Sequence, residues 1–243
     1  MANAISNNSS IDEDTLEVKI KYNNVTKTLG VGDYKTLDGK KVRILGFNHD
    51  NLTNKGAYGG TNTKAGISFE YVDFVIVSDT DEEITTTQMN NSATNIGGWG
   101  ECDLRKKLNE TVYNSLSIKD KIKQVQKVYI PSYRDPSAST ECSDNLWLLS
   151  GDEIWTNWST LREWKDANAA SEGKPYKYYK LKNLSYYTED NYLKKPGVEN
   201  SATWWIRTID WFTSDTFHRV QESGREGLCY AHVLNGVAPG FCL

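Results

Sequence analysis

Residues 204–243, WWIRTIDWFTSDTFHRVQESGREGLCYAHVLNGVAPGFCL, form the segment that decides the fold. The segment opens on two tryptophans and an isoleucine and closes on the apolar run 236–243. The residues between these ends are rich in aromatic, charged and histidine side chains. A closing apolar strand needs a sheet made by earlier residues, because buried backbone groups must be hydrogen-bonded. We therefore interpret the two ends as scaffold and the middle as a displayed surface.

The middle of this segment has the pattern of a β-hairpin. Residues 217–222 and 225–233 read as strands, and Ser223-Gly224 reads as the turn that joins them. Side chains alternate between the two faces of a strand. One face of the second strand carries Glu226, Leu228, Tyr230 and His232, and the other carries Arg225, Gly227, Cys229 and Ala231. We expect the first set to be the more exposed.

The earlier part of the chain supplies further strands. Apolar and charged residues alternate over 16–22, which predicts a half-buried strand, and Asn23-Asn24 reads as the turn after it. Residues 41–47, KVRILGF, are apolar enough for a central strand. Residues 1–14 are polar and rich in Asn and Ser, which predicts a disordered tail. We expect residues 15–243 to form a single domain.

Helices are expected in the middle of the chain. Leu104, Leu108 and Val112 recur at four-residue spacing, which predicts one apolar face of a helix that begins near Trp99. Ser150 and Glu153 have the spacing of a capping box at a helix start. Residues 172–200 have no clear period and predict a long irregular connection.

Composition excludes several classes of protein. The net charge is −4 and no long Lys/Arg run occurs, which argues against nucleic-acid binding. No apolar run approaches the length of a bilayer span, so we expect no membrane insertion. The N-terminus lacks the basic and apolar regions of a secretory signal. We therefore expect reduced cysteines and a protein that stays in the cytoplasm before release or travels in a particle.

An ordered set of short motifs resembles a known family. The motifs are, in chain order, GGW (97–99) with LR (104–105) and LN (108–109), LLS (148–150) with Glu153, WWIR (204–207) and GVAPGFCL (236–243). Together they resemble a bacterial and phage family catalogued as a domain of unknown function, whose members look like C-type-lectin-like domains. The resemblance runs from about residue 30 to the end of the chain. Each motif alone is common, whereas their order is fairly specific for the family.

The resemblance implies an α+β fold of the C-type-lectin-like (formylglycine-generating-enzyme-like) kind. Such a fold has small twisted antiparallel sheets, two or three short helices and long loops, with its first and last strands paired. In some phage and bacterial proteins of this fold, the segment that corresponds to 209–235 is the variable region of a diversity-generating retroelement. The resemblance thus implies a ligand- or receptor-binding protein of a phage, prophage or bacterium, carried on the virion. A homo-oligomer is possible, as in many phage receptor-binding proteins.

Diversification by a retroelement would restrict which residues can occur at the varied positions. Substitution at the adenines of Asn codons cannot produce Trp211, Gln221, Glu222 or Glu226. These positions must be fixed or derive from other codons. The display of the segment does not depend on this mechanism of variation.

The candidate ligand-binding residues all lie between the two apolar ends. Exposed aromatic side chains beside arginines have the composition of a binding hot spot. The predicted set is Asp210, Trp211, Phe212, His218, Arg219, Arg225, Glu226, Leu228, Tyr230, His232 and Leu234. The partner is expected to be a protein or glycan on a cell. For Arg207, which lies inside the apolar WWIR motif, we predict contacts to loop carbonyls or a carboxylate beneath the surface.

Other kinds of site have weaker support. His218, Cys229 and His232 lack the ligand spacing of a zinc site, and residues 79–83 lack that of a calcium loop. No nucleophile elbow occurs, and Cys229 and Cys242 are far apart for the paired cysteines of formylglycine-generating enzymes. We expect no enzyme activity, no metal and no cofactor. The alternative to ligand binding is a structural or assembly domain that uses the same segment against a neighbouring subunit.

Overall fold

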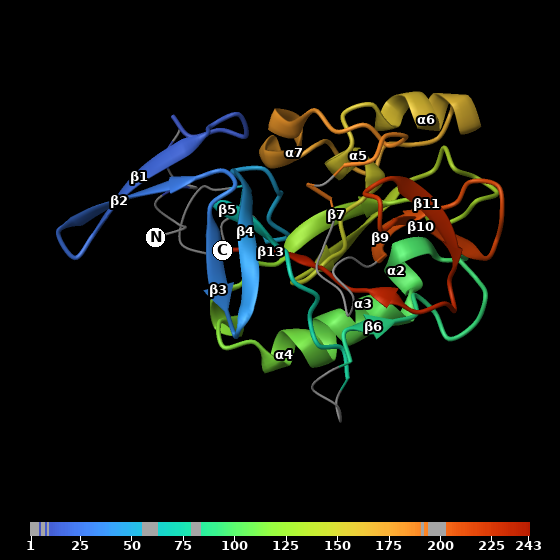
Figure 1. The fold of residues 1–243 in the computed structure, drawn as a ribbon, viewed down its shortest axis with the longest axis horizontal. Coiled ribbons are helices and arrows are strands. Elements are labelled where there is room, and N and C mark those ends of the chain that lie inside the picture. Colours follow the sequence, from blue (N-terminus) through green and yellow to red (C-terminus); the bar gives the residue numbers. More distant parts are fainter. Residues whose placement is uncertain are drawn as a thin grey trace.

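The computed structural model describes residues 5, 8, 10–54, 63–78, 84–190, 192–193 and 203–243. It is an α+β fold of small, mainly antiparallel sheets and short helices (Figure 1). The strands are β1 (Glu17–Tyr22), β2 (Val25–Gly30), β3 (Tyr34–Leu37), β4 (Lys40–Phe47), β5 (Ile67–Tyr71), β6 (Thr86–Thr87), β7 (Val125–Tyr129), β8 (Thr140–Asp144), β9 (Trp204–Ile209), β10 (Thr216–Val220), β11 (Glu226–Tyr230), β12 (Asn235–Gly236) and β13 (Gly240–Cys242). The helices are α2 (Gly98–Glu101), α3 (Asp103–Lys107), η1 (Leu108–Val112), α4 (Tyr113–Ser115), η2 (Lys119–Lys121), α5 (Gly151–Ile154), α6 (Trp158–Lys165) and α7 (Lys177–Lys182).

The last strand completes a sheet made by the first third of the chain. This sheet has the order β13-β5-β4-β3, and Phe241 of β13 lies opposite Phe69 of β5. The two rings stack with their centroids 5.1 Å apart. The expectation that the apolar C-terminal run pairs with an earlier sheet is confirmed, as is the predicted strand at 41–47.

The first and last strands do not pair with each other. β1 instead pairs with β2 over six residues, and the pair forms a separate two-stranded sheet. Asn23 and Asn24 both have positive φ, 47° and 61°, as a tight hairpin turn requires. The predicted turn is therefore confirmed. It folds β2 back onto β1, so the pairing implied by the family resemblance is wrong here.

A five-stranded sheet contains most of the strands of the segment 204–243. Its order is β11-β10-β9-β12-β6, and β9 is buried along its whole length. β9, the WWIRTI strand, lies in the middle of this sheet, and β11 lies at one edge. Neighbouring pairs are antiparallel, except for the parallel bridge between Gly236 of β12 and Trp204 of β9. The apolar start of the segment is thus the centre of the sheet that displays the hairpin.

Short helices lie on two sides of the molecule. α3 and α4 lie along one side, and α6 and α7 along the opposite side (Figure 1). Leu104, Leu108 and Val112 are buried, as their spacing predicts. The Ser150–Glu153 capping box is present at α5. The predicted irregular connection 172–200 is wrong in part, because α7 forms within it and buries Tyr178 and Tyr179.

The described part of residues 1–14 contacts the domain. Ile5 is fully buried, and Ile11 packs against the core. Asn48 Nδ2 donates a hydrogen bond to the carbonyl oxygen of Ile11 at 2.7 Å, and Lys177 Nζ lies 3.1 Å from Asp14 Oδ1. These described residues depart from the predicted disordered tail because their apolar side chains join the core. Residues 1–4, 6, 7 and 9 lie outside the described residues.

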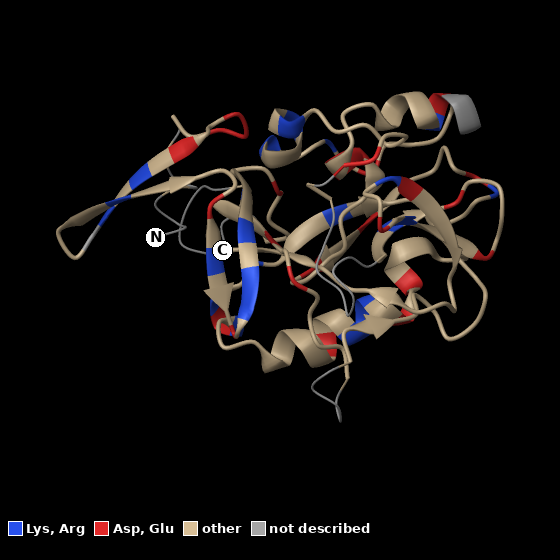
Figure 2. Ribbon diagram, viewed as in Figure 1, with Lys and Arg blue, Asp and Glu red and all other residues tan. Residues whose placement is uncertain are grey.

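Charged residues of both signs are spread over the ribbon (Figure 2). Among the residues that the structure describes, no helix is long and apolar enough to cross a bilayer.

Candidate functional site

The predicted hairpin is present at the edge of the five-stranded sheet. β10 and β11 pair antiparallel, with His218 opposite Leu228 and Phe217 opposite Cys229. Gly224 in the connecting turn has φ of 86°, which favours glycine. β10 in turn pairs with β9, so the hairpin is attached to the buried centre of the sheet.

Six of the predicted site residues, Arg225 among them, are exposed. Phe212 and Leu234 are 60% and 61% exposed, Tyr230 is 54% exposed and Leu228 is 38% exposed. His232 is exposed as well, and its ring lies 5.9 Å from that of Tyr230 in a stacked arrangement. Gly227 and Ala231, on the other face of β11, are buried. The expected alternation of exposure along the second strand is therefore confirmed over residues 227–232 and wrong at 225–226, where Arg225 is exposed and Glu226 is partly buried.

Three of the predicted site residues are buried, and their expected display is wrong. Asp210, Trp211 and His218 are 2%, 4% and 0% exposed. Asp210 holds the turn between β9 and β10, since its Oδ2 accepts hydrogen bonds from Thr213 Oγ1 at 3.0 Å and Thr216 Oγ1 at 3.1 Å. This tight turn directs the next residue, Trp211, into the protein.

Trp211 and His218 belong to an aromatic cluster beneath the hairpin. The Trp158 ring of α6 lies 5.9 Å from the Trp211 ring and 5.0 Å from the His218 ring. His218 Nδ1 lies 2.6 Å from Glu226 Oε1, which links the buried histidine to β11. The cluster supports the hairpin from below, so these two residues are scaffold.

The other three predicted residues are charged. Arg225 is exposed, whereas Arg219 and Glu226 are partly buried. Arg219 Nη1 donates to Asn235 Oδ1 at 3.1 Å, and Glu226 is engaged by His218. Of these three side chains, Arg225 alone is exposed.

The outer edge of β11 is engaged at both ends. The Glu226 backbone N–H donates to the Tyr186 carbonyl oxygen at 2.9 Å, and Gln221 Nε2 donates to the Glu226 carbonyl oxygen at 2.8 Å. At the other end, the Val233 N–H donates to the Tyr230 carbonyl oxygen at 3.0 Å. These bonds limit strand addition at this edge. A partner would therefore contact β11 mainly through side chains.

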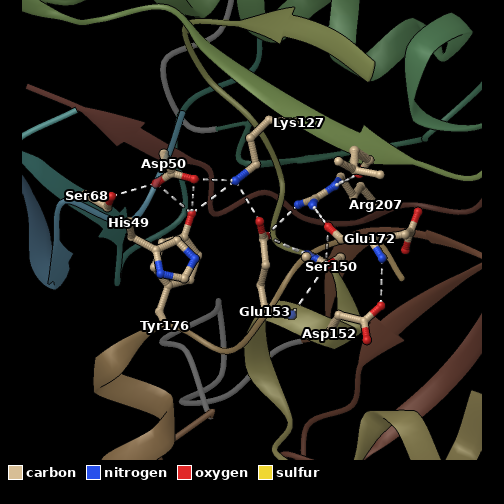
Figure 3. Close-up of polar contacts among 12 residues, drawn as sticks. His49, Asp50, Ser68, Lys127, Ser150, Asp152, Glu153, Glu172, Tyr176 and Arg207 are labelled. Atoms are coloured by element: carbon tan, nitrogen blue, oxygen red, sulfur yellow. Dashed lines mark hydrogen bonds and ion pairs between the residues drawn. The ribbon is translucent and has the colours of Figure 1, made fainter. Parts of the chain in front are cut away.

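A buried ionic network lies behind β9 (Figure 3). Arg207 is fully buried, and its Nη1 donates to Glu153 Oε2 at 2.5 Å and to the Leu148 carbonyl oxygen at 2.7 Å. Its Nη2 donates to the Glu172 carbonyl oxygen at 2.6 Å and its Nε to the Val128 carbonyl oxygen at 3.2 Å. The predicted role of Arg207, binding loop carbonyls and a carboxylate beneath the surface, is confirmed.

Lys127 extends this network toward β4 and β5. Its Nζ lies 2.8 Å from Asp50 Oδ1 and 2.6 Å from Glu153 Oε1, and it donates to the Tyr176 hydroxyl at 3.1 Å. Ser68 Oγ donates to Asp50 Oδ2 at 2.6 Å. Each charge is therefore paired and hydrogen-bonded, as burial requires.

The pKa values of the network follow from these contacts. Burial raises the pKa of Asp50, but neighbouring Lys127 outweighs it and holds that pKa well below its usual range. Burial likewise opposes ionisation of Glu153, yet Arg207 and Lys127 lower its pKa. Glu172 differs, because burial dominates and raises its pKa to about 7. Its carboxylate accepts hydrogen bonds from the Ile130 N–H at 3.1 Å and from Thr208 Oγ1.

Apart from Arg207, the residues of this network were not predicted from the sequence, although one pattern indicated Lys127. Val125, Lys127 and Tyr129 occupy alternate positions of β7 and are all buried. A lysine between two inward apolar residues of a strand predicts a buried cation that needs a carboxylate. The carboxylates come from distant segments, so their identity required the fold.

The four cysteines and the described histidines and carboxylates were the candidates for disulfide and metal sites. Within the described ranges, no three His, Cys, Asp or Glu side chains are grouped so that they could hold a metal ion. Cys102, Cys142, Cys229 and Cys242 are free thiols, and burial raises the pKa of the Cys102 thiol to about 12.

Comparison with known proteins places the chain by sequence. No curated protein matches it, and no solved structure matches it. Residues 72–243 match a family described as a domain of unknown function, DUF6273. The match covers helices α2–α7, both strands of the hairpin and the Arg207 strand. The chain therefore belongs to the DUF6273 family.

Proposed function

We propose that this protein is a non-enzymatic binding protein that presents a recognition surface on a C-type-lectin-like scaffold. The recognition surface comprises Phe212, Leu228, Tyr230, His232 and Leu234. One observation carries the proposal: Leu228 and Tyr230 are exposed on one face of β11 with His232 stacked on Tyr230, and Phe212 and Leu234 are exposed in the loops before and after the hairpin. Clustered exposed apolar side chains are typical of interaction sites.

The support beneath the recognition surface fits a display role. β11 is fixed to β10, and β10 to the fully buried β9. The Trp158–Trp211–His218 cluster fills the space below. Outward side chains on such a framework can change with little loss of stability, because surface substitutions usually alter the free energy of unfolding by about 0.5 kcal/mol or less. This property is what a variable surface requires.

The partner we propose is a protein or glycan on a cell, and the source we propose is a phage, prophage or bacterium with a diversity-generating retroelement. Aliphatic residues such as Leu228 and Leu234 favour a protein partner, since they cannot hydrogen-bond sugar hydroxyls. A second candidate function is assembly, in which the same exposed apolar residues contact a neighbouring subunit. The exposed side chains are compatible with both.

A binding comparison tests the recognition surface. Labelled protein is applied to a panel of bacterial cells, immobilised cell-surface proteins and glycans, next to a variant that combines L228S, Y230S and L234S. We expect the variant to lose about tenfold or more of the binding, because apolar and aromatic anchors dominate interfaces. Its free energy of unfolding should fall by no more than about 1 kcal/mol.

The matched control combines V25S and L181S, which remove exposed apolar side chains from β2 and α7. The control should bind like the unaltered protein. Equal binding by all three proteins would contradict the proposal. A change in oligomeric mass that is confined to the triple variant would favour the assembly function instead.

A further inference from the structure

A cavity opens beside the buried ionic network, away from the recognition surface. Its volume is about 210 Å³. It lies between β7, the residues that follow β4 and the segment before α7. Figure 3 shows the inner wall, where Lys127 lies between Asp50 and Glu153. The groups that could hold a ligand here are those that the protein itself leaves without a partner.

Most charged groups of the cavity wall are already engaged by the protein. Asp50 and Glu153 are both paired with Lys127. Glu172 accepts hydrogen bonds from the backbone of the residue that follows β7 and from a hydroxyl group of β9. Lys174 is paired with a carboxylate of the N-terminal segment. These five charged groups therefore already have their partners.

Three further lining residues lie in a row across neighbouring segments of the chain. Asn51 forms an antiparallel bridge with Lys64, and Leu52 and Val125 form the next bridge. Gln126 therefore lies opposite Asn51, and its N–H donates to the Asn51 carbonyl oxygen at 2.9 Å. Side chains that lie directly opposite each other in antiparallel segments share one face. The ammonium group of Lys64 and the amides of Asn51 and Gln126 therefore face the same space, the cavity that all three residues line.

These three side chains have open hydrogen-bonding positions. Lys64 Nζ donates to the His49 carbonyl oxygen at 2.9 Å and forms no ion pair with a carboxylate of the described residues. Burial lowers the pKa of Lys64, so an anion beside it would stabilise the charged form. The side-chain amides of Asn51 and Gln126 have no hydrogen-bond partner in the part of the chain that the structure describes. An amide offers donors and an acceptor next to each other.

His49 gives the cavity a buried side chain that lacks a partner. It lines the cavity and is 8% exposed, and its ring packs on Tyr176 with the centroids 4.0 Å apart. Within the described ranges, no group hydrogen-bonds either ring nitrogen of His49. Burial lowers the pKa of His49, so the neutral ring offers one N–H donor and one acceptor. Buried polar groups normally have partners, so a ligand that fills the cavity would supply them.

We propose that this cavity binds a small sugar acid, a compound that carries one carboxylate and several hydroxyl groups. The carboxylate would bind Lys64, the cation of the cavity wall that has no ionic partner among the described residues. The hydroxyl groups would bind His49, Asn51 and Gln126, because a hydroxyl both donates and accepts hydrogen bonds, as the neutral imidazole and the amides do. A cavity of 210 Å³ has about seven times the volume of one water molecule in the liquid, which suits a single monosaccharide.

The proposal is tested by thermal unfolding and calorimetric titration of the full chain with gluconate, glucuronate and galacturonate. We expect at least one of these sugar acids to raise Tm by about 4 °C at a concentration near ten times its Kd. The comparison compounds are the neutral sugars glucose and galactose and the plain carboxylates acetate and hexanoate. They should give no shift at that concentration, because each lacks either the carboxylate or the hydroxyl groups that the cavity binds.

Two variants assign the site. K64Q should weaken binding of the sugar acid by about tenfold or more, because it removes a charge-assisted hydrogen bond. H49F keeps a ring on Tyr176 but removes both nitrogens, and it should also weaken binding. The matched controls are K35Q, at an exposed position of β3, and H232F, on the recognition surface. Both controls should bind the sugar acid like the unaltered protein.

Three results would overturn the proposal. The first is that no sugar acid raises Tm or gives a heat of binding. The second is that a plain carboxylate or a neutral sugar binds as tightly as the sugar acid. The third is that K64Q binds like the unaltered protein, and this test stands even where H49F fails to fold, because Lys64 is only partly buried. None of them bears on the recognition surface, because its residues do not line this cavity.

Discussion

Replacing Arg207 by methionine is expected to lower the free energy of unfolding by about 3–5 kcal/mol, the usual effect of removing one partner of a buried ion pair. The guanidinium holds Glu153 and three carbonyl oxygens, those of Leu148, Glu172 and Val128. Its loss leaves these acceptors buried without their donor. A domain is typically stable by about 5–15 kcal/mol, so much of the folded state would be lost. Urea denaturation at neutral pH measures the change.

Two further proteins make this result specific. R225M removes an exposed arginine of the hairpin turn and should change the free energy of unfolding by about 0.5 kcal/mol or less. The double variant R207M/E153Q should be less destabilised than the sum of its two single changes, because the Glu153 charge that loses Arg207 is removed as well. If R207M lies within about 1 kcal/mol of the unaltered protein, the network is not the support of β9.

Glu172 should lower the stability of the protein as pH rises from about 4.5 to about 7, against an opposite contribution from His49, whose pKa is lowered by burial. The pKa of Glu172 is raised from its ordinary value of 4.5 to about 7, chiefly by burial. Between these values the folded state keeps a proton that the unfolded chain releases, so the free energy of unfolding decreases with pH. The shift corresponds to about 3 kcal/mol in total. Below this window the sign reverses, because the lowered pKa values of Asp50 and Glu153 stabilise the fold only while these groups are ionised.

The variant E172Q isolates this effect. Glutamine has nearly the same shape and cannot ionise, and its amide can still bond to the Ile130 N–H and to Thr208. We expect its free energy of unfolding to lose the fall with pH that Glu172 causes between about 5 and 7, and to rise slightly instead, because burial lowers the pKa of His49. Urea denaturation of E172Q and of the unaltered protein at several pH values in that range measures the two free energies of unfolding. A fall of the same size in E172Q would assign the proton to another group.

The predictions from sequence succeeded where one local pattern was sufficient. The apolar ends 204–206 and 236–243 predicted buried strands, and the alternation along β11 predicted its exposed face. Arg207 inside an apolar strand predicted a paired buried cation, because an unpaired one is too unfavourable. In each case the signal lies within a few residues, and the tertiary structure had only to agree with it.

The predictions failed where a turn or a distant segment decides the outcome. Trp211 follows the core strand in a polar stretch, which favours exposure, yet the Asp210 turn directs it onto Trp158 of α6. Asp50 and Glu172 lie in loops without period, and only the fold brings them to Lys127 and Arg207. The pairing of β1 with β2 shows the same limit, since a tight Asn-Asn turn prevails over the expected contact between the first and last strands.

Sequencing the coding region of this protein in many individuals of one natural population tests the central claim, a recognition surface displayed on a fixed scaffold, most directly. We predict that substitutions concentrate, at adenine positions, in the codons of the exposed residues Phe212, Leu228, Tyr230, His232 and Leu234. The codons of the buried residues Asp210, Trp211 and His218 should stay constant. An invariant 209–235 segment, or variation spread equally over buried and exposed codons, would contradict the account.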